Sequence, residues 1–255
     1  MIISYEIPTP HLKDLGHYNN YSFCLAHLAL QDRAYVDYYK NAKGYKVVDN
    51  SIFELAHPLP YADVIKAADI LHADEVVSPD SFQNGPKTIK ATEDFLKFFT
   101  AANLTGKYKV MGVVQGSNIP SWVKCFQWMD KNPLIDVIGL SYVGCASFAN
   151  DPMNSRIRAV KYAVDHIKPT KPIHLLGIGG NPLEVFLQKT FPQVRSCDTS
   201  IPVVDGYYNA KYDVKKGSSI LPKNKRPADY FNITMTNSQL TDAHFNMECI
   251  KSWLK

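Results

Sequence analysis

The stretch KVMGVVQGSNIPSWVKCFQWMDKNPLIDVIGLS, residues 109–141, contains a complete strand–helix–strand pattern. Apolar residues dominate 109–114 and 137–141, as is typical of parallel strands that are buried on both faces. Between these runs, Ile119–Lys131 has the pattern of a helix. Two parallel strands joined by a helix form a right-handed unit, so the fold depends on how often this unit recurs along the chain.

The same alternation continues in both directions from this stretch. We predict strands at Ile2–Glu6, Ser22–Ala26, Tyr45–Val48, Glu75–Val77, Lys109–Val114, Val137–Ser141, Ile173–Ile178 and Val194–Cys197. We predict helices at Asp32–Asn41, Pro60–His72, Lys87–Thr100, Ile119–Lys131, Pro152–His166 and Pro182–Thr190. About eight strand–helix repeats in a chain of 255 residues predict an α/β fold, a single (β/α)8 TIM-type barrel, rather than an open sheet.

The pattern changes after Pro202, so we assign residues 1–202 to the barrel core and 203–255 to an extension of the same domain. Residues 204–228 are polar and rich in Gly, Pro and Lys, which predicts a long loop. Asn237–Lys255 has the pattern of a closing amphipathic helix that packs on the barrel.

Composition narrows the class of protein. No stretch approaches the roughly 20 apolar residues of a membrane span, and the N-terminus lacks the basic and apolar regions of a signal peptide, so we expect a cytoplasmic protein with no membrane partner. The five cysteines are scattered, which favours reduced and mostly buried thiols over a zinc or disulfide motif. The net charge of +4 is compatible with nucleic acid but does not by itself indicate it.

The predicted loop contains a basic cluster next to aromatic residues. Its basic residues are Lys211, Lys215, Lys216, Lys223, Lys225 and Arg226, and Tyr207, Tyr208 and Tyr212 lie before or among them. Positive charge interleaved with aromatic rings suits a surface that follows a nucleic-acid backbone and stacks on bases. The alternative interpretation is a solvated loop without a partner.

Three aspartates follow predicted strands: Asp49 in KVVDNS, Asp80 in EVVSPDSF and Asp198 in RSCDTSIP. Because barrel active sites lie at the carboxyl ends of the strands, we expect these side chains to share one rim. Two carboxylates over one pocket suit chemistry at a sugar carbon, where one attacks and the other manages the proton of the leaving group. For any single one of them, the alternative is a helix cap or a turn former.

Two other features are less informative. The glycines of GIGGNP, residues 177–182, follow a strand but match neither the dinucleotide nor the phosphate-loop pattern, so a tight turn explains them equally well. His174 lies inside a predicted strand, where a lone histidine is more often a satisfied core residue than a ligand.

Six motifs in order resemble those of the queuine and archaeosine tRNA-guanine transglycosylases. They are VVDNSIF, ADEVVSPD, GVVQG, IGLSYVG, HLLGIGG and CDTSIP, and together they cover Asp49 to Pro202. Within this family the chain looks most like the DNA-modifying relatives found in phages and bacteria, which insert 7-deazaguanines into DNA. A phage origin would place the activity in the host cytoplasm.

The resemblance implies a role for each matching position. Asp198 matches the nucleophile that attacks C1′ and expels guanine, and Asp49 matches the general acid and base. Asp80 matches the carboxylate that reads the N1/N2 edge of the base. The other positions that match base contacts are the amide of Gln115 with Gly116 after it, the backbone N–H of Gly139, and the flat or apolar residues Phe53 and Leu176.

Departures from the family also carry information. The tRNA enzymes have a C-x-C-x-x-C…H zinc site after the nucleophile strand, whereas this chain has only Cys249 and His244 there, so we expect no metal and no cofactor. The missing segment helps those enzymes to bind tRNA and to dimerise. Cys145 replaces an acidic residue that reads an aminomethyl group on the incoming base, which favours an uncharged substituent such as a nitrile.

These features predict a DNA-guanine transglycosylase that inserts a 7-deazaguanine, 7-cyano-7-deazaguanine being the expected base. Three alternatives stay open: the same chemistry on tRNA, a catalytically silent nucleic-acid-binding barrel, and an unrelated barrel hydrolase or lyase that uses the same carboxylates. The sequence is compatible with a homodimer or with a helper protein that opens the duplex.

Overall fold

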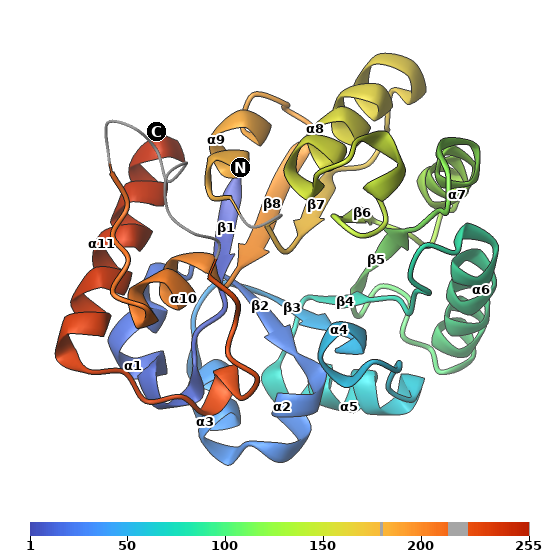
Figure 1. Cartoon of the computed structure of the whole chain (residues 1–255). Helices are drawn as coiled ribbons and strands as arrows, with labels where there is room; N and C mark the ends of the chain where they lie inside the picture. Colours follow the sequence, from blue (N-terminus) through green and yellow to red (C-terminus); the bar gives the residue numbers. More distant parts are fainter. Residues whose placement is uncertain (179–180, 214–223, 255) are drawn as a thin grey trace.

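Eight parallel strands form a nearly closed (β/α)8 barrel in the computed structural model of the chain (Figure 1). The structure describes residues 1–178, 181–213 and 224–254. The strands are β1 (Ile2–Tyr5), β2 (Tyr21–Leu25), β3 (Tyr45–Asp49), β4 (Glu75–Val77), β5 (Lys109–Val114), β6 (Val137–Ser141), β7 (Ile173–Leu176) and β8 (Val194–Thr199). The predicted fold class is therefore confirmed, and each predicted strand is present within about two residues of its predicted ends.

The sheet runs in the order β1-β8-β7-β6-β5-β4-β3-β2, so consecutive strands from β2 to β8 are paired and β8 also pairs with β1. Strands β1 and β2 meet through a side-chain hydrogen bond rather than through a backbone ladder. The backbone N–H of Phe23 on β2 donates to Ser4 Oγ on β1 at 2.8 Å. The register places Ser4 beside Asp198 and Leu25 beside Asp49. The carboxyl ends of the strands thus meet at one mouth.

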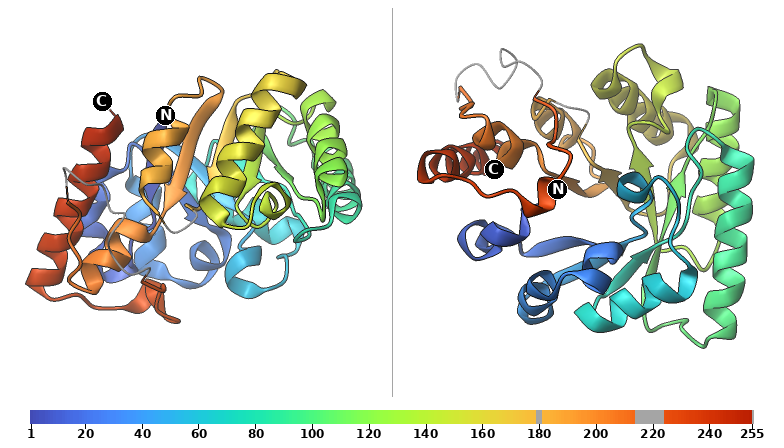
Figure 2. Two further views of the ribbon diagram at one scale, coloured as in Figure 1. Left: turned by 45° about the horizontal axis from the view of Figure 1, so that its top comes forward. Right: turned by 60° about the horizontal axis from the view of Figure 1, so that its bottom comes forward.

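The predicted helices lie on the outside of the barrel (Figures 1 and 2). They are α3 (Arg33–Asn41), α5 (Tyr61–Leu71), α6 (Gly85–Ala101), α7 (Ile119–Lys131), α8 (Pro152–Tyr162), which continues as the π-helix Ala163–Ile167, and α9 (Leu183–Gln188). Asp32, Asn84, Asn118 and Asp151 cap α3, α6, α7 and α8, each accepting a hydrogen bond from a backbone N–H two or three residues into the helix.

Short helices that the sequence did not predict complete the loops. They are α1 (Leu12–Leu15), α2 (Ala26–Gln31), α4 (Ile52–Leu55) and the 3-10 turns Thr9–His11, Gly16–Tyr18, Ala146–Phe148 and Tyr230–Asn232. Helix α4 follows β3 directly and carries Phe53 over the barrel mouth. The segment is too short for a periodic signal to distinguish it from a loop.

The barrel interior has its own small apolar cluster, separate from the larger core between strands and helices. Its buried members are Tyr21, Phe23, Val47, Val77, Met111, Val113 and Val137. The five cysteines are also buried, and none forms a disulfide. In the part of the chain that the structure describes, no helix is long and apolar enough to cross a bilayer.

The C-terminal extension packs beside the first helices, so the two ends of the chain lie side by side (Figures 1 and 2). It contains α10 (Ile201–Tyr207) and α11 (Asn237–Leu254). The prediction that a loop begins at residue 204 was wrong. Helix α10 continues to Tyr207, and its apolar residues are buried in the core. Tyr212 is also buried: it donates to Asp205 and stacks on Trp253, so its ring is not available to a base.

Replacing Gly206 with alanine is expected to weaken the docking of α11. A Cβ at this position would lie 2.5 Å from the backbone nitrogen of Ala243, and backbone cannot yield as a side chain can. We expect the free energy of unfolding to fall by about 1–3 kcal/mol, measured by urea denaturation. Ala243→Gly should not rescue the variant, because the closest contact is to main chain. If Gly206→Ala were as stable as the wild type, the close packing of Gly206 against Ala243 would be contradicted.

Candidate active site

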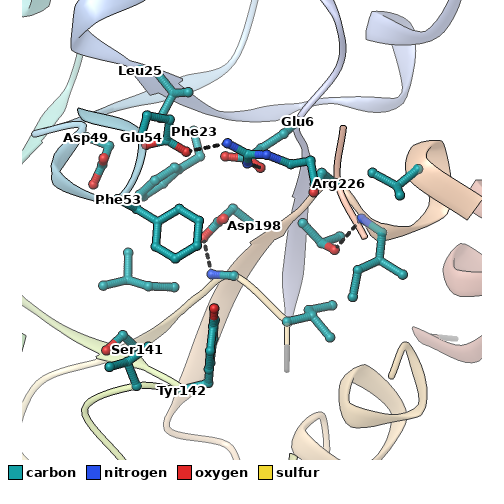
Figure 3. A pocket seen from close by; sticks show the side chains of 18 of the residues that line it. Glu6, Phe23, Leu25, Asp49, Phe53, Glu54, Ser141, Tyr142, Asp198 and Arg226 are labelled. Carbon is teal, nitrogen blue, oxygen red and sulfur yellow. Dashed lines mark hydrogen bonds and ion pairs between the residues drawn. The ribbon is translucent and has the colours of Figure 1, made fainter. Parts of the chain in front are cut away.

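A pocket of about 680 Å³ opens at the carboxyl-terminal mouth of the barrel. Asp49, Asp80 and Asp198 all line it, together with apolar and aromatic side chains. Figure 3 shows Asp49 and Asp198 with the ring of Phe53 nearby. The three carboxyl groups come from the ends of β3 and β8 and from the loop after β4. The structure therefore brings together the aspartates that the strand-end pattern predicted to share a rim.

Asp198 is held through one of its two carboxylate oxygens. Its Oδ1 accepts from the backbone N–H of Gly177 at 3.0 Å and lies 3.0 Å from Nε2 of His174. Gly177 adopts a φ of +64°, a left-handed conformation that suits glycine and directs this N–H toward the carboxylate. Both contacts use Oδ1, and within the described ranges no other residue hydrogen-bonds to Oδ2, so the protein leaves that oxygen uncommitted.

Asp49 sits at the end of β3 in a tight turn. Its Oδ2 accepts from the backbone N–H of Ser51 at 2.7 Å, and Ser51 has a φ of +61°. Burial raises the pKa of Asp49 well above its usual range, and the nearby carboxylate of Glu54 raises it further, while the Ser51 hydrogen bond lowers it in part. This environment favours the protonated form of the Asp49 carboxyl group relative to that of an exposed aspartate.

Asp80 is buried, and its carboxylate accepts a hydrogen bond from the side chain of Gln115. The Gln115 amide donates to Asp80 Oδ2 at 2.6 Å, and its own Oε1 accepts from the backbone N–H of Gln83 at 3.0 Å. Burial raises the pKa of Asp80 to about 6, although hydrogen bonds from Gln115 and Asn50 lower it in part. Gln115 is fully buried, so here it orients Asp80.

The remaining predicted base contacts divide into two groups. Phe53 and Leu176 line the pocket, and Phe53 is 55% exposed. Gly116 and Gly139 are buried and do not line the pocket. A Cβ on Gly116 would lie 2.5 Å from the backbone of Trp122. A Cβ on Gly139 would lie 3.0 Å from Met111 and 3.1 Å from Leu176. Their lack of a side chain is thus explained by packing.

Arg226 reaches over the pocket from the C-terminal extension (Figure 3). It lies 3.1 Å from Glu6 and 2.7 Å from Glu54, and its guanidinium is 5.9 Å from the ring centre of Phe53. Burial raises the pKa of Glu6, with Arg226 lowering it in part. The charge of Arg226 is therefore balanced within the protein.

The other basic residues of the predicted nucleic-acid surface are placed differently. Lys225 is exposed at the pocket rim, and Lys211 pairs with Asp242 on α11 at 3.0 Å. Lys215, Lys216 and Lys223 lie outside the described residues.

Sequence reasoning did not select Glu6 or Glu54 in this region, and it favoured a core role for His174 over a place in the site. Glu6 ends the first predicted strand, so the strand-end rule that selected Asp49 could have selected it. Glu54 follows Phe53 directly. His174 gave no sequence signal, because a histidine in an apolar strand has the same pattern whether it serves the core or a site.

No group of three or more His, Cys, Asp or Glu side chains is arranged to bind a metal within 1–178, 181–213 and 224–254. No protein-family model matches the chain, and no curated protein is significantly similar to it. The fold and the pocket therefore define the class: a (β/α)8 barrel with a carboxylate-lined cavity at its carboxyl-terminal mouth.

Proposed function

We propose that the protein is a DNA-guanine transglycosylase, which exchanges guanine in DNA for a 7-deazaguanine base such as 7-cyano-7-deazaguanine. The observation that carries this proposal is that Asp49, Asp80 and Asp198 line one pocket. The six ordered sequence motifs give these residues distinct roles, and their different environments are consistent with those roles.

The pocket offers complementary groups to a guanine-like base. An ionised Asp80 accepts from the adjacent N–H groups of the base, and Gln115 keeps its carboxylate in place. Phe53 and Leu176 supply flat or apolar surface for the ring faces. A base without the N–H donors would leave the buried Asp80 without its partners, which penalises wrong bases strongly.

The first displacement uses Asp198 and a protonated Asp49. Asp198 Oδ2 attacks C1′ of the target nucleotide, an ester bond forms, and the bond from C1′ to N9 of guanine breaks. The expelled guanine takes its proton from Asp49, whose raised pKa favours the protonated form.

The second displacement reverses these steps. The ionised Asp49 removes the N9 proton of the incoming 7-deazaguanine, and that nitrogen attacks C1′. The ester bond breaks and Asp198 regains its charge, so the configuration at C1′ is retained overall.

Several carboxylates in the pocket repel phosphate, so the polynucleotide backbone must stay at the rim, where Lys225 is exposed. The target nucleotide therefore has to flip out of the duplex for C1′ to reach Asp198. The chain also has no counterpart of the cysteine-rich segment by which the tRNA enzymes hold their substrate, which favours DNA over tRNA.

The test is incubation of the protein with radiolabelled guanine and either guanine-containing DNA or tRNA. We expect label to enter DNA. Label in tRNA alone would reject the DNA substrate, and release of free base without incorporation would indicate a hydrolase. Mass spectrometry of nucleosides from DNA co-expressed with the protein would then identify the inserted base.

Base binding is expected to weaken as the pH falls through about 6, the value to which burial raises the pKa of Asp80. Below that pH Asp80 is protonated and loses an acceptor for the base; above it the carboxylate accepts and the affinity levels off. Equilibrium dialysis of 7-cyano-7-deazaguanine from pH 5 to 8 measures this. Since Asp49 also titrates above its usual range, Asp80→Asn is the control, and it should bind weakly without this step. An unchanged step in Asp80→Asn would assign it to another group.

A further inference from the structure

His174 contacts Asp198, but the chemistry described above gives it no role. It lies on β7, fully buried, with its side chain inside the barrel. Its Nε2 is 3.0 Å from Asp198 Oδ1, and its ring stacks on Phe23 with centroids 4.9 Å apart and planes 7° apart. The stacking and the burial fix the orientation of the ring.

The other ring nitrogen faces hydroxyl groups. Nδ1 lies 2.8 Å from Ser196 Oγ and 3.3 Å from the hydroxyl of Tyr21. Arg195 donates to both of these oxygens, through Nε to Ser196 at 3.1 Å and through Nη2 to Tyr21 at 3.1 Å. Because the guanidinium can only donate, each hydroxyl accepts from it and keeps its own hydrogen for another acceptor.

The Ser196 hydroxyl has two acceptors within reach, Nδ1 of His174 at 2.8 Å and the Tyr21 hydroxyl at 3.3 Å, and the shorter contact favours Nδ1. If Nδ1 accepts, the ring hydrogen must be on Nε2, where it points at Asp198. Arg195 is in turn held by Glu75 through two contacts of 2.9 and 3.0 Å, and Glu75 also accepts from the Tyr45 hydroxyl at 2.8 Å. A chain of hydrogen bonds thus runs from the far end of the barrel to Asp198.

We propose that His174 is a positioning residue: Arg195 and Ser196 fix its Nε2–H tautomer, and this N–H with the Gly177 amide holds Oδ1 of Asp198 so that Oδ2 is presented for attack. The proposal rests on the proposed function for its catalytic consequence, but its geometry can be tested without turnover. Burial lowers the pKa of His174, which favours the neutral ring that the arrangement requires.

The first test compares His174→Gln with His174→Met. Both variants lose the ring and its stacking on Phe23, but glutamine keeps an N–H donor at similar reach. Loss of a hydrogen bond to a charged group is expected to lower kcat of His174→Met about 10- to 100-fold, with KM for the incoming base within about threefold of wild type. His174→Gln should recover most of this loss. Equal kcat in wild type and His174→Met would overturn the proposal, as would an equal loss in both variants.

The second test reads the tautomer directly by 15N NMR of the histidine rings. The chain has eight histidines, and the signals of His174 are those missing from the His174→Gln spectrum. We expect a neutral ring with protonated Nε2 and unprotonated Nδ1. A ring protonated at Nδ1, or at both nitrogens, would overturn the proposal. If His174→Met does not fold, Ser196→Ala is the variant to use, because it keeps the histidine ring and removes only the hydroxyl next to Nδ1. We expect it to show a mixture of the two His174 tautomers and a severalfold lower kcat.

The two readouts separate the two proposals. If the wild type exchanges no base but shows the Nε2–H tautomer, the transglycosylase assignment fails and the positioning of the carboxylate stands. If the wild type exchanges base and the ring is protonated at Nδ1, the function stands and the role of His174 fails.

Discussion

Asp198→Asn is expected to lower the rate of base exchange by about 10⁴-fold or more, with no loss of fold. Asparagine has nearly the shape of aspartate, and its Oδ1 can still accept from Gly177 and His174. Its amide nitrogen replaces the oxygen that the proposed mechanism uses for attack and cannot form the ester with C1′. The measurement is incorporation of radiolabelled guanine into DNA.

A second readout of the same variant is the covalent intermediate. Wild-type protein incubated with DNA in the absence of incoming base should form an adduct that persists on a denaturing gel, and Asp198→Asn should form none. The matched control is Asp136→Asn, the same change at the opposite end of the barrel, where Asp136 accepts from the backbone of Val110. Exchange by Asp198→Asn within tenfold of wild type would assign the nucleophile elsewhere.

Arg156→Met is expected to lower the free energy of unfolding by about 3–5 kcal/mol. Arg156 and Glu184 form an ion pair in which the side chains are 0% and 1% exposed, with Nε 2.6 Å from Oε1. The variant removes the cation that pairs with the buried carboxylate of Glu184, and a buried charge that loses its counter-ion is costly. Against a typical total of about 5–15 kcal/mol, this loss is large enough to see directly in urea denaturation.

The same arginine supports the site. It donates to the carbonyl oxygens of Leu140, Leu176 and Gly177 at 3.1, 2.8 and 2.5 Å, and so ties together the ends of β6 and β7. Since the Gly177 N–H holds Asp198, exchange should fall together with stability.

Two further variants serve as controls for the loss of stability in Arg156→Met. Arg33→Met removes an ion pair to Asp37 in which the arginine side chain is 88% exposed, and it should change stability by less than about 1 kcal/mol. Arg156→Met combined with Glu184→Leu removes both charges and should recover part of the loss. A change below about 1 kcal/mol for Arg156→Met alone would show that the buried pair is not needed.

The sequence by itself determined the barrel and the shared rim. Parallel strands buried on both faces must be runs of apolar residues, and the helices between them must be amphipathic, so the alternation is visible without coordinates. Once eight such units close, the carboxyl ends of the strands meet at one mouth. The convergence of Asp49, Asp80 and Asp198 follows from that topology alone.

Only the tertiary structure decided which side chains touch one another. The contact between His174 and Asp198 depends on the register of β7 against β8, and the pairing of Arg226 with Glu6 and Glu54 joins residues up to 220 positions apart. A count of charges in the loop at 211–226 cannot tell a cation that is free from one that is neutralised. Hydrogen bonds and ion pairs act over a few ångströms in space, and local sequence patterns carry no information about such distances.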